Sequence, residues 1–377
     1  MHPYGSCARQ EDTCQVGSHF YMSSPVLPDH AIEFRRVRED HEFFEICRTP
    51  ELATEITVQP IRRYKGLIDA AIIFSDILVI PQALGMEVLM QPGPVFPHPL
   101  DTPADLARLP DKVDVDEALG YVFDAITMTC KKLEGEVPLI GFCGAPWTLM
   151  MYMIEGGGSK TLQKSKTWLF KYPDESKALL RRLADVCVEF LVGQVKAGAQ
   201  VVSLASFCGA LLTHTFVYYP QLLQIFDSNA GDLSPYDFET FSIPVLRQMS
   251  SGVRDRLASL GIAQVPLTLF AKGASPSLAA RCGYDVIGLS WTQDPLDVVN
   301  NHGVDAALQG NLDPTVLYGG REAIEREVER MCKTFRSARG GVTKGWIANL
   351  GHGITPGVDP EDLKWFFECI HKYSAHA

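Results

Sequence analysis

The stretch AAIIFSDILVI (residues 70–80) is almost wholly apolar, with a single carboxylate, Asp76, near its middle. Short apolar runs of this kind recur along the chain, each ending in glycine, proline or polar residues, and they lack polar–apolar alternation. Continuous apolar strands are typical of a parallel sheet that is covered on both faces. The runs predict strands at residues 70–80, 137–147, 197–204, 265–271, 284–291, 305–312 and 346–353.

Helical patterns separate these runs. The clearest lies between Ser176 and Ala197, where large apolar residues recur at helical spacing. Further helices are predicted near residues 115–133, 236–260, 321–336 and 360–373. Polar residues follow the carboxyl ends of several different strands, as the active sites of (β/α)8 barrels require. The sequence therefore predicts an α/β fold of the (β/α)8 TIM-barrel type that is one strand short, with a three-layer open sheet as the alternative.

Composition narrows the class of protein. The 377 residues are 46% hydrophobic, and the formal net charge of −11 includes no block of like charges, which argues against nucleic acid and membrane as partners. Ten cysteines without a CxxC motif indicate a reducing compartment, and we expect a cytoplasmic protein. The first residues lack the apolar core of a secretory signal. We therefore expect a disordered tail over residues 1–24 and a single barrel domain over residues 25–377.

Four isolated polar residues are candidates for chemistry. Burying an unpaired carboxylate is costly, so Asp76 is expected to be paired, protonated or used. Tyr152 precedes a run of three glycines, Ser228 follows an apolar run, and His352 stands between two glycines. Each also has a structural interpretation, as a turn cap or a packed core residue. Neither an HExxH motif nor a histidine with cysteine two residues on occurs, so the sequence gives no local support for zinc.

Four longer motifs resemble the uroporphyrinogen decarboxylase family, and the resemblance runs from about Glu33 to the C-terminus. They are FSDILVIPQALGMEV (74–88), LIGFCGAPWTLMMYMIEGGGS (139–159), LQGNLDP (308–314) and NLGHGITP (349–356). The resemblance implies a (β/α)8 barrel, usually a homodimer, that needs no cofactor. It also implies a carboxy-lyase of haem biosynthesis, which removes the four acetate carboxyls of uroporphyrinogen III to give coproporphyrinogen III.

The resemblance also implies roles for individual residues. Asp76 would face the pyrrole N–H groups and stabilise a cationic ring, while Tyr152, Ser228 and His352 match the substrate-contacting residues of the family. Arg38, within EFRRVREDHEFF (33–44), matches a family arginine by its spacing from EF and FF. The implied catalytic residues are Asp76, Tyr152 and His352. The implied substrate-binding residues are Arg38, Asp76, Tyr152, Ser228 and His352.

Two segments depart from the family pattern. PVLPDHAIEF (25–34) replaces the first strand and a loop whose two arginines grip substrate carboxylates, so we expect that strand to be missing. An apolar insertion near residues 202–222 separates AGAQV (197–201) from QIFDS (224–228). We interpret it as translated intron, since GTAAGT can encode Val202–Ser203 and CAG can encode Gln221 or Gln224. A membrane span is the alternative explanation of this uncharged stretch.

Two alternatives to decarboxylase activity remain open. An inactive or regulatory porphyrin-binding paralogue would explain the absent arginine loop, since an anion site without its arginines loses most of its affinity. A cobalamin-linked methyltransferase would share the barrel but usually needs a zinc-binding set of histidine and cysteine, which the sequence lacks.

Overall fold

The computed structural model describes residues 32–91, 93–199, 220–338 and 345–374, so the predicted tail over residues 1–24 lies outside the described residues. Seven parallel strands pair in chain order into one sheet, which confirms the predicted parallel arrangement. They are β1 (Ala71–Ile72), β4 (Leu139–Gly144), β5 (Pro220–Asp227), β6 (Leu267–Ala271), β7 (Val286–Gly288), β8 (Ala307–Leu312) and β9 (Trp346–Leu350). A small hairpin joins β2 (Leu89–Met90) to β3 (Pro94–Val95).

Helices alternate with the strands, and all five predicted helices are confirmed to within a few residues. The α-helices are α1 (Ile32–Asp40), α2 (Phe43–Arg48), α3 (Pro50–Arg63), α4 (Val79–Ala83), α5 (Val115–Leu133), α6 (Pro146–Glu155), α7 (Gln163–Lys171), α8 (Pro173–Ala199), α9 (Pro235–Asp237), α10 (Ile243–Ser259), α11 (Pro276–Ala280), α12 (Pro295–Asn300), α13 (Arg321–Ala338) and α14 (Pro360–Ser374). Short 3-10 turns are η1 (Pro103–Arg108), η3 (Ala230–Asp232) and η5 (Pro314–Tyr318), and η4 (Phe238–Ser242) is a π-helical turn before α10. Several of these helices start at proline, which suits a first helical position because its missing N–H has no partner there.

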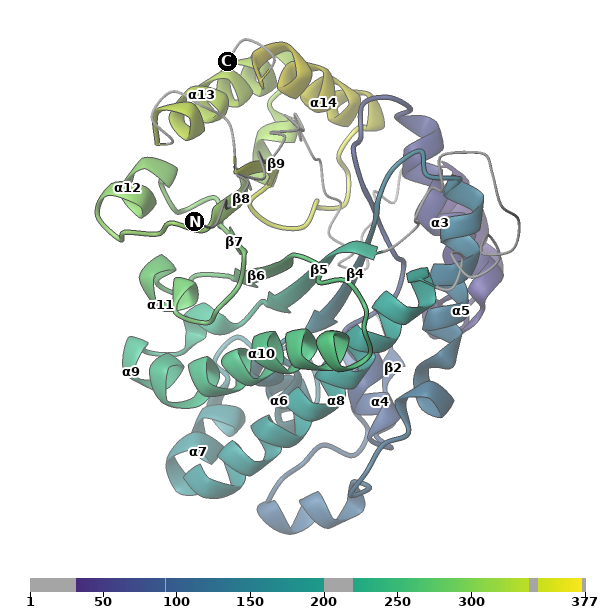
Figure 1. Cartoon of the computed structure of the whole chain (residues 1–377), viewed down its shortest axis with the longest axis vertical. Coiled ribbons are helices and arrows are strands. Elements are labelled where there is room, and N and C mark those ends of the chain that lie inside the picture. Colours follow the sequence, from purple (N-terminus) through teal and green to yellow (C-terminus); the bar gives the residue numbers. More distant parts are fainter. Residues whose placement is uncertain (1–31, 92, 200–219, 339–344, 375–377) are drawn as a thin grey trace, which may run out of the picture.

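The sheet curls, and the helices cover its outer side (Figure 1). Within the described residues no strand pairs with the free edges of β1 and β9. The helical layer nevertheless closes there: the Tyr64 ring, at the end of α3, packs edge-on against Phe367 of α14 at 5.2 Å, and its hydroxyl donates to the Pro360 carbonyl oxygen. The architecture is therefore that of a TIM-type barrel lacking one strand, as predicted; most of the segment that replaces this strand lies outside the described residues.

The inner face of the sheet is layered. An apolar cluster of Ala70, Ile140 and Leu222 lies deepest, with Ile72 and Ile347 against it. Gln309 Nε2 of β8 then reaches Gln224 Oε1 of β5 at 3.4 Å, which is possible only if both side chains point inward. Three phenylalanines of neighbouring strands, Phe142, Phe226 and Phe270, form the next layer, with ring centroids 5.7 and 6.5 Å apart.

One predicted strand is wrong. Residues 197–199 form the last turn of α8, because its buried stripe continues through Val195 and Ala197, and the remainder of 197–204 lies outside the described residues. The strand at this place in the sheet is β5, which holds the predicted QIFDS end. Its pairing with β4 is irregular at Pro220 and becomes regular at Leu222, where the family motif resumes.

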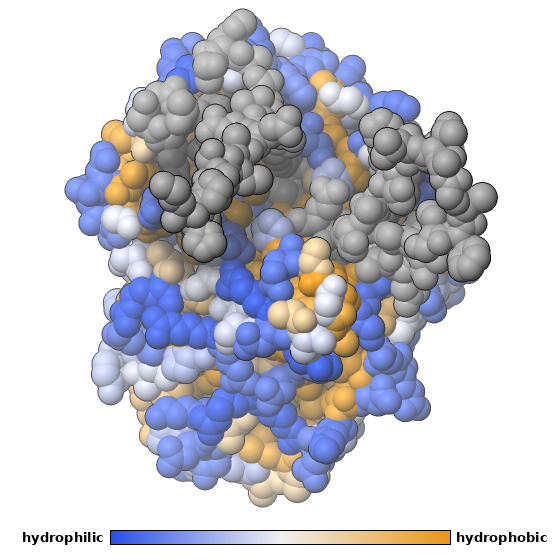
Figure 2. Space-filling model, viewed as in Figure 1, coloured by the Kyte–Doolittle hydropathy of each residue, from blue (hydrophilic) through white to orange (hydrophobic). Residues whose placement is uncertain are grey.

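One face of the molecule carries many polar residues. Figure 2 shows hydrophilic residues over much of the coloured surface of this face, with hydrophobic patches between them. Among the described helices none is both long enough and apolar enough to cross a bilayer. The apolar insertion, the segment for which a span was considered, lies almost entirely outside the described residues.

Deleting residues 202–219, which leaves β5 whole, is expected to raise the free energy of unfolding by about 2 kcal/mol, because closing a connection of about two residues costs less entropy than closing one of about twenty. Chemical denaturation of both chains measures the change. A chain in which a Gly/Ser linker of equal length replaces these residues is the control, and it should match the original chain. A deletion variant less stable than that control would mean that the segment contributes native contacts.

Candidate active site

The predicted residues lie at the carboxyl ends of the strands. Asp76 follows β1, Tyr152 lies on α6 just after β4, Ser228 comes directly after β5, and His352 comes shortly after β9. Parallel strands in a curled sheet end on one side, so these four side chains share one end of the sheet. Arg38 lies on α1, before the first strand of the sheet.

Asp76 is a half-buried carboxylate with a single hydrogen bond. The Leu78 backbone N–H donates to its Oδ1 at 2.7 Å. Burial raises the pKa of Asp76 to about 6, because desolvation disfavours the charged form more than this hydrogen bond favours it. Within the described residues no cation forms an ion pair with Asp76. The carboxylate is thus placed at the strand end without a counter-charge.

Tyr152 and Asp76 are close enough to influence each other electrostatically. Burial is the main cause of the raised pKa of Tyr152, and the negative charge of Asp76 raises it further. The phenol therefore stays protonated at neutral pH and can donate a hydrogen bond. Behind it, α6 ends at Gly156, whose φ of 84° is left-handed, and a Cβ at Gly157 would lie 2.8 Å from the Pro94 carbonyl oxygen. The glycines after Tyr152 thus serve this turn and close backbone packing.

Arg38 belongs to the same side of the site. The buried Cys47 thiol has its pKa raised by burial and by the charge of Asp76, and lowered by the charges of Arg48 and Arg38. The guanidinium of Arg38 donates to the His41 carbonyl oxygen at 2.9 Å and lies 5.8 Å from the centre of the Phe43 ring. Asp76 and Arg38 thus both act on Cys47, and Asp76 also acts on Tyr152, so the structure brings these three predicted residues to one side of the site.

His352 occupies a different part of this end of the sheet. Its half-buried ring lies edge-on to Trp291, with centroids 5.6 Å apart, and its Nδ1 is 3.4 Å from the Gly353 carbonyl oxygen. Burial, followed by the positive charge of Lys272, lowers the pKa of His352, so the ring is neutral at neutral pH. Trp291 and Lys272 were missed in the sequence, although Trp291 ends the strand predicted at 284–291 and Lys272 directly follows the one predicted at 265–271.

Asp227, next to Ser228, is fully buried and points away from the site. Thr148 Oγ1 of α6 donates to its Oδ1 at 2.7 Å, while Oδ2 has no partner among the described residues. Burial raises the pKa of Asp227 to about 7. Because side chains alternate along a strand, an outward Asp227 places Ser228 on the inner face, above the phenylalanine layer. Among the described residues no hydrogen bond or ion pair joins Ser228 directly to Asp76 or His352, so its place in the site rests on this alternation.

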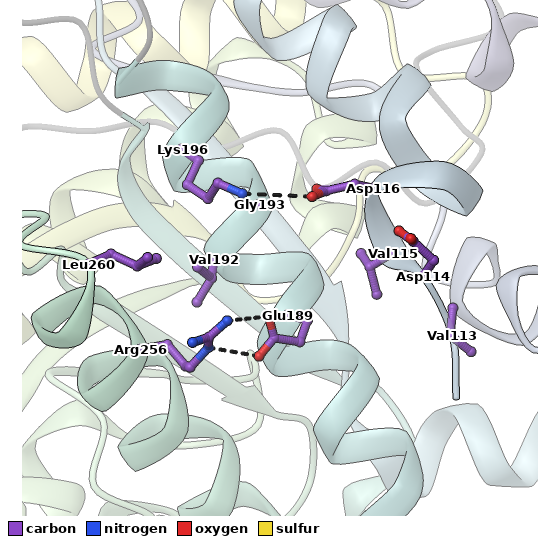
Figure 3. A pocket seen from close by; sticks show the side chains of 10 residues that line it. All are labelled: Val113, Asp114, Val115, Asp116, Glu189, Val192, Gly193, Lys196, Arg256 and Leu260. Atoms are coloured by element: carbon purple, nitrogen blue, oxygen red, sulfur yellow. Dashed lines mark hydrogen bonds and ion pairs between the residues drawn. The ribbon is translucent and has the colours of Figure 1, made fainter. Parts of the chain in front are cut away.

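A cavity of about 340 Å³ lies away from the predicted site residues. It is enclosed by the start of α5 and the later parts of α8 and α10 (Figure 3). No strand residue lines it, and its two cations are already paired: Lys196 with Asp116 at 3.8 Å and Arg256 with Glu189 at 2.9 Å. It therefore offers no free charge to an anion. In the described part of the chain, no cluster of histidine, cysteine and acidic side chains could hold a metal ion, and seven buried cysteines are free thiols.

Comparison with known proteins identifies the family. A solved methyltransferase structure from Methanosarcina mazei shares the fold, with a TM-score of 0.63 at 19% identity over 87% of both chains. The family model described as "Uroporphyrinogen decarboxylase (URO-D)" matches residues 23–218 and 203–373. Curated relatives named uroporphyrinogen decarboxylase are 49% identical in Schizosaccharomyces pombe and in Danio rerio, over 91% of this chain and 90% and 86% of theirs. This chain therefore belongs to the uroporphyrinogen decarboxylase family.

Proposed function

We propose that this protein decarboxylates the four acetate side chains of uroporphyrinogen III to give coproporphyrinogen III, without a cofactor. Family membership supports the reaction, and one observation supports the mechanism: at the carboxyl end of β1, Asp76 is a desolvated carboxylate to which no cation of the described part of the chain is paired. Hydrogen bonds from N–H donors, which carry partial positive charge, stabilise such a carboxylate strongly. The pyrrole N–H groups of a porphyrinogen are donors of this kind.

Decarboxylation needs a group that accepts the electron pair of the broken C–C bond. When an acetate arm loses CO2, the electrons of the broken C–C bond remain on the methylene carbon. A pyrrole ring that has first been protonated on carbon accepts them, and a second proton on the methylene group with loss of the first restores the aromatic ring. Each cycle thus consumes one proton and releases one CO2. A fixed carboxylate in a desolvated site stabilises the cationic ring more strongly than water would.

The other residues would bind and orient the substrate. Tyr152, whose raised pKa keeps the phenol protonated, would donate to an oxygen of the substrate near Asp76. The neutral His352 and the hydroxyl of Ser228 would contact the substrate from the other strands. Arg38 would bind a side-chain carboxylate, since a guanidinium binds such groups through two parallel N–H bonds.

The proposal extends to assembly and location. We expect a homodimer, as the family resemblance implies, in the cytoplasm, as the ten cysteines without a CxxC motif indicate, with no nucleic-acid or membrane partner. The net charge of −11, which includes no block of like charges, supports the last point. Light scattering of the pure protein measures the mass of the assembly, and a monomer at micromolar concentration would contradict the dimer.

The variant Asp76→Asn should lower kcat by at least about a hundred-fold, because the amide keeps the shape but cannot stabilise a cationic ring by its charge. Anaerobic assays with uroporphyrinogen III, with separation of products by carboxyl number, measure this. Asp69→Asn is the control: Asp69 precedes the same strand, and its pKa is also raised by burial. Turnover by Asp76→Asn within a few-fold of this control would refute the role of Asp76.

The pH dependence of kcat/KM should show an acidic limb with an apparent pKa of about 6. The ionised form of Asp76 is the active one, and its fraction falls as the pH drops through this pKa, so activity should fall by about ten-fold per pH unit below it. Steady-state assays between pH 5 and 8 test this. Constant kcat/KM down to pH 5 would contradict the assignment.

The variant His352→Ala should change which partly decarboxylated intermediates accumulate, because the substrate presents a different acetate arm in each cycle and His352 fixes its orientation. The product profile from heptacarboxyl to tetracarboxyl porphyrinogen is the measurement. His302→Ala is the matched control, since His302 is exposed and contacts Asp297 instead. Identical profiles for the two variants would remove His352 from the site.

A further inference from the structure

Lys272 follows β6 and lies on the inner face of the sheet. Thr268 of β6 is in register with the inward Gln224 of β5, and Phe270 belongs to the inward phenylalanine layer. Side chains alternate along a strand, so Lys272 is the next inward residue, beside Ser228 at the end of β5. Its backbone N–H donates to the Asp227 carbonyl oxygen at 3.1 Å and extends the β5–β6 pairing by one step.

The backbone of Lys272 is held firmly. Its carbonyl oxygen accepts from the Gly231 N–H at 2.8 Å. A Cβ at Gly231 would lie 2.8 Å from the Gly273 Cα, so the two glycines let the loops after β5 and β6 pack backbone against backbone. Gly273 also has a φ of +76°, a conformation that favours glycine. This packing fixes the point from which the lysine side chain starts.

The ammonium group of Lys272 lacks a carboxylate partner among the described residues. Its Nζ lies 5.9 Å from the centre of the Trp291 ring, whose other neighbour is His352. Other cations of the chain are paired with carboxylates: Arg254 with Asp285, Arg256 with Glu189 and Arg281 with Glu239. Asp227, the nearest acid in sequence across the strand pair, points outward to Thr148. A half-buried ammonium in contact only with an aromatic ring retains unused hydrogen-bond donors.

We propose that Lys272 binds a side-chain carboxylate of the substrate, beside Trp291 and His352. The inference deepens the proposed function and rests on it, since the substrate there carries eight carboxylates. It also supplies a cation where the sequence lacks others: residues 25–34, which replace the family's arginine loop, contain no arginine. Arg38 and Lys272 would then hold carboxylates at different parts of the rim of the ring, while Asp76 faces its centre.

The test compares Lys272→Met with Lys171→Met. Lys171 also lies over an aromatic ring, Tyr172 at 5.1 Å, but on α7, outside the sheet. Lys272→Met should raise the KM for uroporphyrinogen III by about ten- to a hundred-fold, which corresponds to the loss of one hydrogen bond between charged groups. The effect on kcat should be smaller. Lys272→Arg, which keeps the charge, should recover most of that loss. Lys171→Met should leave both constants unchanged.

A second readout does not depend on turnover. Because the charge of Lys272 lowers the pKa of His352, Lys272→Met should raise that pKa, whereas Lys272→Arg and Lys171→Met should not. NMR titration of the histidine ring protons measures this shift and also reports whether each variant is folded. If the original chain decarboxylates but Lys272→Met and Lys171→Met share the same KM, the inference is overturned while the proposed function stands. If the original chain neither binds nor converts uroporphyrinogen III, the proposed function and the role of Lys272 are both overturned.

Discussion

The carboxylate of Asp76, desolvated and without a counter-cation among the described residues, is the feature on which the proposed chemistry depends. Holding it ionised in an apolar stretch opposes folding, and its raised pKa of about 6 expresses that cost. The surrounding structure must therefore stabilise the site strongly. Ile73, Leu78, Val79 and Ile80 of the same stretch are buried, and Phe74 packs against Phe43 with centroids 5.8 Å apart. The stretch is thus anchored on both sides of Asp76.

The distribution of charge at this end of the sheet matches the shape of a tetrapyrrole. The donors of such a ring point to its centre, and its carboxylates lie on its rim. Asp76 supplies a negative charge near Tyr152, while Arg38 and Lys272 supply positive charges from α1 and the end of β6. The phenylalanine layer of Phe142, Phe226 and Phe270 lies on the inner face below Ser228 and Lys272. An apolar floor of phenylalanines, with a central negative charge and positive charges around it, would suit a macrocycle that has N–H groups at its centre and carboxylates on its rim.

The sequence predicted the parts of the fold that follow from local pattern. Continuous apolar runs identified six of the seven parallel strands, and helical spacing identified α5, α8, α10, α13 and α14. The predicted strand at 197–204 was wrong because a short apolar run has the same local pattern at the end of a helix as at the start of a strand. In the structure, tertiary packing extends α8 to Ala199. The family model matches in two overlapping parts, 23–218 and 203–373, and their overlap falls within the predicted insertion.

The site was only partly predictable for a physical reason. Asp76 is conspicuous because a charge in an apolar run violates the local pattern, and His352 because glycines flank it. Lys272 and Trp291 stand at the ends of apolar runs without a distinguishing motif, and they become notable only when the sheet brings them beside His352. The missing ion pair of Lys272 is a property of the three-dimensional arrangement, so no sequence pattern could reveal it.

The central claim is that the Asp76 carboxylate binds the N–H groups of the tetrapyrrole, and proton release on binding tests it most directly. Donors at Asp76 would lower its pKa, so binding of coproporphyrinogen III at pH 6 should expel the proton that about half of the molecules carry. Anaerobic calorimetry in buffers of different ionisation enthalpy measures this number for the original chain and for Asp76→Asn. The account predicts that the original chain releases about half a proton more than the variant; equal release, with binding intact in both, would contradict it.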